Sequence, residues 1–205
     1  MKPARRAAVL DLEQLDHLLH YVAAHSRQPL RDYACFLLSF KAGLRAQEIA
    51  GLDWEDVYDP YLEIADAIEV PTDIAKNGKA RRVPLHPALK ATLQALRQQQ
   101  GPERTHPSDP IIRSAEPVHD GITPPARVSP DALQRYMSRI ATQSGLHGVT
   151  SHSGRRTFIT KAIRSAPFVG ASLFDVQRIV GHADAETTAA YVESSAAWDA
   201  LVRRV

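Results

Sequence analysis

The stretch LRDYACFLLSFKAGLRAQEIAGL, residues 30–52, decides the fold class. Residues 30–41 are apolar nearly all round, which predicts a buried helix. Gly43 follows as the residue at which such a helix ends, and a short second helix is expected over residues 46–52. The first expectation is therefore a core built from helices.

On the N-terminal side of this stretch, the sequence predicts one more helix. Asp11 can cap it, and Gln14 completes a capping-box-like pair with Asp11. The apolar residues at helical spacing on one face are Leu12, Leu15, Leu19 and Val22. Residues 1–10 are then an N-terminal tail, and residues 11–205 form one domain.

On the C-terminal side, the only strand-like region runs from Tyr61 to Leu85. Asn77-Gly78 within it is the strongest short signal for a β-hairpin. Pro87 occupies a first-turn position and opens a helix with an apolar face. A small antiparallel sheet should therefore be set among helices.

The remainder of the chain is predicted to be a long connection followed by helices. Half of the prolines fall within residues 101–130, which indicates a surface connection with one short strand at Ile111-Ile112. Ser129-Pro130 begins a helix that stops at Gly145. Three more helices are expected, at about 153–165, 172–180 (capped by Ser172 with Asp175 and stopped by Gly181) and 185–192. The fold class is mainly α with a small antiparallel β-sheet (α+β).

Composition bounds the function only loosely. The chain has 205 residues, 44% of them hydrophobic and 23% charged, which suits one globular domain. The formal net charge of +2 does not reveal a nucleic-acid partner, although basic residues cluster locally. The single Cys35 cannot form an internal disulfide, and no apolar stretch is long enough to span a bilayer. We expect a cytoplasmic protein.

Four segments carry a recognisable pattern. They are GLRAQEIAGL with WEDV (43–52 and 54–57), KNGK leading to VPL (76–79 and 83–85), HSGRRTF (152–158), and VGH with a later TT and Tyr191 (180–182, 187–188). Together, in this order from about Asp11 to Tyr191, they resemble the signature boxes of the tyrosine recombinase (phage integrase) family. The separation of His182 and Tyr191, 191 − 182 = 9, matches the family. The resemblance implies the fold of that family's catalytic domain and site-specific DNA recombination.

The residue types also suit the cleavage of a phosphodiester, independently of the family resemblance. A phosphodiester under attack becomes a phosphorane with extra negative charge, which planar, bidentate arginines stabilise. Arg45, just after a helix-ending glycine, and Arg155 are the candidates. Arg155 follows His152 by three positions, so both should share one helix face.

Tyr191 would be the nucleophile that forms the 3′-phosphotyrosyl intermediate. A phenol with a pKa of about 10 is mostly protonated at neutral pH and needs nearby cations or a base. The resemblance implies that His152 accepts or relays the proton. It also implies that His182 bonds a phosphate oxygen and helps to position Tyr191.

Lys76 would be the general acid that protonates the leaving 5′ oxygen, with Lys79 as the competing choice. Lys76 is preferred because the family's lysine lies before the turn. Lys79, Arg81 and Arg156 are expected to contact DNA. No cofactor and no metal are implied, since transesterification through a phosphotyrosine conserves the bond energy.

The implied partner is double-stranded DNA with paired recombination sites, bound by a homo-oligomer, a tetramer on DNA and a monomer or weak oligomer when free. Two alternatives stay open: a type IB topoisomerase-like enzyme that relaxes DNA as a monomer, and a non-catalytic DNA-binding or regulatory protein on the same fold. Neither the target site nor the outcome (integration, excision or inversion) follows from the sequence.

Several features depart from the family. Gly154 stands where leucine is usual and Arg156 where histidine is frequent. Most relatives carry an N-terminal core-binding domain, for which this chain has only residues 1–10. We expect a naturally short protein, with a trimmed chain as the alternative. Residues 193–205 are expected to form a C-terminal tail helix that packs on its own domain or on a neighbouring subunit.

Overall fold

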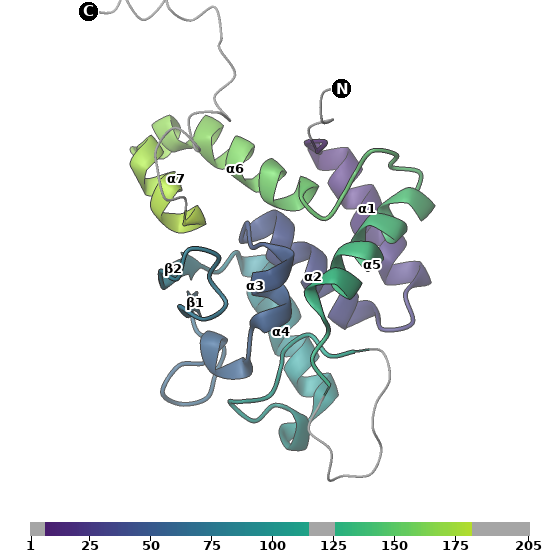
Figure 1. Ribbon diagram of the computed structural model, residues 1–205, viewed down its shortest axis with the longest axis vertical. Coiled ribbons are helices and arrows are strands. Elements are labelled where there is room, and N and C mark those ends of the chain that lie inside the picture. Colours follow the sequence, from purple (N-terminus) through teal and green to yellow (C-terminus); the bar gives the residue numbers. More distant parts are fainter. Residues whose placement is uncertain (1–6, 115–125, 182–205) are drawn as a thin grey trace, which may run out of the picture.

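Helix α2 (Pro29–Lys41) is the centre of the computed structural model, which describes residues 7–114 and 126–181 (Figure 1). It packs against α1 (Leu12–His25), α4 (Pro87–Gln100) and α6 (Ser153–Ser165). Its residues 34–40 are all buried, and the Cys35 thiol lies among them. Neighbours on several sides explain why α2 is apolar nearly all round, and the prediction of a buried helix is confirmed.

The predicted helix ends are confirmed where their chemistry could be read from the sequence. Asp11 caps α1, and the reciprocal bond from Gln14 completes the capping box. Gly43, with φ of +66°, follows the end of α2. Ser129 caps α5 (Pro130–Gln143) through a bond to the backbone of Ala132. The caps provide partners for backbone groups that the helix ends would otherwise leave unbonded.

The sheet is shorter than the predicted strand-like region. It consists of β1 (Ala67–Val70) and β2 (Arg81–Pro84), which are antiparallel with Val70 opposite Arg81. Residues 71–80 join them, so Asn77-Gly78 is a turn within a longer connection and not a tight turn between paired strands. The turn is real, since Gly78 has φ of +59° and its N–H donates to the Ala75 carbonyl. The sequence identified the turn but placed the strands too close to it.

The predicted strand at Ile111-Ile112 is absent, which is a correction. Both side chains are buried, and the Ile111 N–H donates to the Leu52 carbonyl at 3.1 Å. The segment forms only isolated bridges, Asp53 with Pro110 and Arg113 with Arg127. It lies against the 3-10 helix Trp54–Val57 that follows α3 (Ala46–Gly51), so the connection is partly interior.

Helices α6 and α7 (Leu173–Val180) are joined by the 3-10 helix Ala166–Val169 and share a small apolar cluster. Ser172 and Asp175 form the predicted capping box of α7, and Gly181 ends it in the left-handed conformation. Figure 1 shows α7 at the far end of α6, beside β2, with which it is in contact. The chain therefore brings the end of α7 next to the hairpin.

The expected helix at 185–192 and the tail at 193–205 lie outside the described residues. Within residues 7–114 and 126–181, no helix combines the length and the apolar character that crossing a bilayer would need.

Candidate active site

A small cavity of about 40 Å³ collects cationic side chains from separate parts of the chain. Arg45 reaches it from the start of α3, Lys76 and Lys79 from the connection 71–80, and Arg81 from β2. The remaining lining residues are Ala75, Asn77 and Gly181. Two predicted catalytic residues, Arg45 and Lys76, therefore lie at one site.

Arg45 is oriented by the carboxylate of Glu48. Its backbone N–H donates to Glu48 Oε2 at 2.8 Å and its Nη1 to Oε1 at 3.1 Å. Glu48 occupies the third position of α3, so the pair closes the first turn of the helix. The Arg45 side chain keeps 21% of its surface exposed at the cavity. One carboxylate thus holds the arginine while part of its surface faces outward.

Glu48 is a fully buried carboxylate that sequence analysis missed. Besides Arg45, it binds Arg81, whose Nη1 and Nη2 donate to the two carboxylate oxygens at 2.9 and 2.8 Å. Burial alone would raise the pKa of Glu48, but the bonds and charge of Arg81, aided by those of Arg45, hold it below the usual 4.5. Glu48 is therefore ionised at neutral pH. Its position three residues after Arg45 was the available signal.

Arg155 does not line the cavity and is buried to 7% exposure. Its Nη1 donates to the Gly43 carbonyl and its Nη2 to the Val180 carbonyl, both at 2.6 Å. These carbonyls lie at the C-terminal ends of α2 and α7, where the helix dipoles favour a cation. Arg155 therefore ties α6 to the ends of α2 and α7, and its bond to Val180 lies one residue before Gly181 of the cavity.

His152 stands at the N-cap of α6 and its side chain is exposed. It directly precedes the helix, and its exposed side chain contrasts with the buried side chain of Arg155 three residues later. Arg156 follows Arg155 and is partly exposed. At the start of α6, His152 is thus exposed and Arg155 buried.

The basic residues that line the cavity from the hairpin region differ in their exposure. Lys76 and Lys79 are both exposed and both line the cavity, so geometry leaves each of them a candidate general acid. The Arg81 side chain, in contrast, is only 7% exposed, and its guanidinium binds Glu48 and the Ile179 carbonyl. The Arg81 guanidinium is therefore engaged by groups of the protein itself, and its expected contact with DNA stays a prediction.

His182 and Tyr191 lie outside the described residues. Gly181, directly before His182, lines the cavity, so the described chain leads up to the cationic site. Residues 7–114 and 126–181 contain no group of three or more histidine, cysteine or acidic side chains placed to hold a metal ion.

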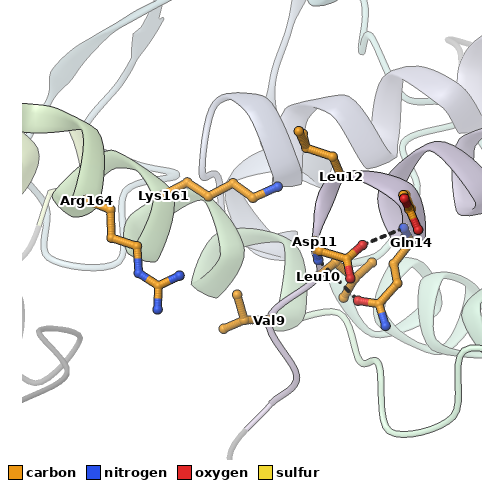
Figure 2. Close-up of a pocket in the computed structure, with 8 residues that line it drawn as sticks. Val9, Leu10, Asp11, Leu12, Gln14, Lys161 and Arg164 are labelled. Carbon is orange, nitrogen blue, oxygen red and sulfur yellow. Dashed lines mark hydrogen bonds between the residues drawn. The ribbon is translucent and has the colours of Figure 1, made fainter. Parts of the chain in front are cut away.

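A larger groove of about 670 Å³ lies between the start of α1 and α6 (Figure 2). Figure 2 shows Lys161 and Arg164 on one side and the bonded pair Asp11 and Gln14 on the other. None of the predicted catalytic residues lines this groove. The small cationic cavity is therefore the candidate active site.

Solved structures share this fold. The crystal structure of XerA recombinase matches with a TM-score of 0.70 and 22% identity, covering 100% of this chain and 64% of that one. The XerH site-specific recombinase bound to its difH substrate matches with a TM-score of 0.72 and 17% identity, covering 100% of this chain and 56% of that one. At these identities the likeness concerns the fold alone.

Comparison of the amino-acid sequence identifies the family. The tyrosine recombinase XerC of Rhodospirillum centenum is 30% identical over 190 residues, covering 87% of this chain and 48% of that protein. The XerC of Alcanivorax borkumensis is 29% identical over 193 residues, covering 91% of this chain and 56% of that protein. The chain thus spans about half the length of these relatives. The model of the phage integrase family matches residues 8–197, and the chain therefore belongs to the phage integrase family.

Proposed function

We propose that this chain is the catalytic domain of a site-specific DNA recombinase that cuts and rejoins DNA through a 3′-phosphotyrosyl bond to Tyr191. The observation that carries the proposal is the convergence of Arg45, Lys76 and Lys79 on one cavity, with the buried Arg155 bonded to the residue before Gly181. Several cations around one small space suit the negative charge of a phosphodiester in its transition state.

Each residue has a defined task in the proposed reaction. The Tyr191 hydroxyl attacks the phosphorus, its proton passes to His152, and the bond from phosphorus to the 5′ oxygen breaks. A lysine, Lys76 or Lys79, protonates that oxygen so that it leaves as a hydroxyl. Arg45, Arg155 and His182 stabilise the charge on the non-bridging oxygens. A 5′ hydroxyl of a partner strand then reverses these steps and releases Tyr191.

The relatives support DNA as the substrate. XerC is named a tyrosine recombinase, and XerH was solved on its difH substrate before cleavage. For this chain we propose paired DNA sites held by an oligomer, a tetramer in the synaptic complex. Phosphate contacts should dominate the affinity, so binding should weaken steeply as salt rises.

A suicide substrate tests the reaction. Duplex DNA from the region around the protein's own gene, nicked close to the scissile phosphate, loses a short fragment on cleavage and traps the covalent adduct on a denaturing gel. We expect an adduct with the wild type and none with Tyr191→Phe. DNA that is bound but never joined to the protein would overturn the proposal in favour of a non-catalytic binding role. Relaxation of supercoiled plasmid without paired sites would instead indicate a topoisomerase.

A modified leaving group separates the two lysines. Replacing the 5′ bridging oxygen with sulfur gives a thiolate, which leaves without a proton because thiols are far stronger acids than alcohols. The variant of the true general acid should be slow on ordinary DNA and recover on the sulfur substrate. We expect this for Lys76→Ala, whereas Lys79→Ala should show equal effects on both substrates.

A further inference from the structure

Helix α7 ends with every one of its terminal carbonyls occupied. The Gly181 N–H donates to the carbonyls of Gln177 and Arg178 at 2.9 and 3.3 Å. The next three carbonyls accept from side chains of the site: Ile179 from Arg81 Nε at 3.0 Å, Val180 from Arg155 Nη2 at 2.6 Å, and Gly181 from Asn77 Nδ2 at 3.3 Å. The last carbonyls of a helix lack partners within it, so this end is fixed by residues from elsewhere in the chain.

Arg81 is the member of this set that reaches two parts of the site at once. Its Nε holds the Ile179 carbonyl, while its two terminal nitrogens hold both oxygens of Glu48. Glu48 in turn holds Arg45 through the backbone and the side chain. An unbroken series of bonds therefore joins the end of α7 to Arg45.

Gly181 makes this arrangement possible. Its φ of +65° favours glycine, and a Cβ there would come within 2.9 Å of the Arg81 Cδ. The arginine thus lies across the end of the helix in the space that a side chain would fill. Gly181 and Arg81 therefore meet closely where α7 contacts β2.

We propose that Arg81 is a positioning residue, which clamps the C-terminal end of α7 to Glu48 and so fixes Gly181, the residue before His182, relative to Arg45. Its catalytic consequence rests on the proposed recombinase function. The clamp itself does not rest on that function, because its bonds belong to the folded chain. Arg81 acts through Glu48 and α7, and it need not touch DNA.

The variants Arg81→Lys and Arg81→Gln test the clamp, with Arg82→Gln as the matched control. Lysine keeps the charge beside Glu48 but cannot reproduce a planar fork with three separate bonds. Arg82 follows on the same strand, is 70% exposed and pairs with Glu69 on the surface, so its substitution removes an equal charge without touching α7.

Hydrogen exchange reads the clamp without any DNA. In Arg81→Lys, the amides of α7 should exchange faster than in the wild type, while those of α2 remain protected and Arg82→Gln matches the wild type. Unchanged exchange in α7 would overturn the clamp. Hydrogen exchange tests the clamp even if the wild type forms no adduct. That outcome would contradict the proposed recombinase function but not the clamp.

Cleavage then reads the positioning. Arg81→Lys should bind DNA as the wild type does and form adduct about 10- to 100-fold more slowly, the range expected when a reacting group is displaced by about 1 Å. An adduct rate equal to that of the wild type would overturn the proposal. So would a loss of DNA binding in proportion to the loss of cleavage with α7 exchange unchanged, because Arg81 would then be a DNA contact.

The pH profile separates positioning from a general loss of structure. The charged groups that face Glu48 are Arg45, before α3, and Arg81, on β2. Without the Arg81 cation, burial should raise the pKa of Glu48, so Arg81→Gln should lose adduct formation on the acid side at a pH where the wild type and Arg81→Lys keep it. A purely structural role would lower the rate of Arg81→Gln equally at every pH.

Discussion

Gly154 packs directly against Ser39 where α6 crosses α2. A Cβ on Gly154 would come within 2.2 Å of the Ser39 Oγ and 2.7 Å of its Cβ. The neighbouring Arg155 and the end of α2 thereby approach closely enough for the guanidinium to reach the Gly43 carbonyl. Glycine at position 154, where the family usually has leucine, thus allows α6 to approach α2 closely. The same approach places Arg155, a proposed catalytic residue.

Gly154→Ala tests the close packing of α6 on α2, because the sign of its effect on stability depends on that packing. In an unobstructed helix the change should stabilise the protein by roughly 0.5–1 kcal/mol, because alanine is the better helix former. At this contact we expect instead a loss of about 1–3 kcal/mol in the free energy of unfolding, as for other overpacked interiors. Urea unfolding measures it, and Ser39→Gly in the same chain should restore part of the loss. A stabilised single variant would show that α6 can shift away freely.

Asp56 should make the protein less stable as the pH rises. Burial raises the pKa of its carboxyl to about 6, and the carboxylates of Asp53, Glu55 and Asp73 add to the rise. A raised folded-state pKa contributes stability that is complete below the unfolded value of 3.8 and is lost as the pH rises through about 6. The carboxylate is therefore a cost at neutral pH.

Asp56→Asn removes that cost while keeping an oxygen that can accept the Asp53 N–H. We expect it to stabilise the protein at pH 8 by roughly 1 kcal/mol, less than the full shift would give because the carboxyl is partly exposed. The gain should vanish at pH 4. Urea unfolding at both pH values measures it, and a gain of equal size at both would assign the effect to something other than this carboxyl.

Arg155→Lys should cost both stability and activity. A single ammonium nitrogen replaces the two separate nitrogens that bond the Gly43 and Val180 carbonyls, and a buried carbonyl left without a donor costs about 1–3 kcal/mol. Loss of the planar donor should slow adduct formation by roughly 100- to 1000-fold. Arg164→Lys, exposed on the same helix, is the control. A variant as stable as the wild type would show that the two carbonyls find other partners.

Local chemistry made most of the helices predictable from the sequence. Capping pairs such as Asp11 with Gln14, and glycines such as Gly43 and Gly181, are short-range signals, and the structure has them in place. The strands were harder, because Asn77-Gly78 indicates a turn but not how far from it pairing begins. At Ile111 and Ile112, apolar character predicted a strand, whereas the long-range packing of residues 101–114 produced only isolated bridges.

The candidate site was predictable in its cations but not in how they are held. Arg45 and Lys76 could be identified from their boxes, and the cavity brings them together. Arg81 was grouped with exposed basic residues because charge clusters carry no direction. Its alternation with the buried Val83 on β2 was the signal that it points inward. Its bonds to Glu48 and Ile179 join residues 33 and 98 positions away, which no local pattern encodes.

Glu48→Gln should weaken the protein in a way that depends on pH. The carboxylate is buried between Arg45 and Arg81, so removing its charge leaves two cations short of a partner, at a cost of about 3 kcal/mol. Because Arg81 and Arg45 hold the folded-state pKa below 4.5, the stability that the wild type gains from ionised Glu48 is complete above pH 4.5 and is lost as the pH falls further. The difference in unfolding free energy between wild type and Glu48→Gln should therefore be largest at pH 7 and shrink below pH 4.5.

Urea unfolding between pH 7 and the acid side of pH 4.5 measures this difference. Glu69→Gln is the control that should change little, because the Glu69 carboxylate pairs with Arg82 on the surface. A constant difference at every pH would mean that the charge of Glu48 does not stabilise the fold, and that its shape alone supports the two arginines.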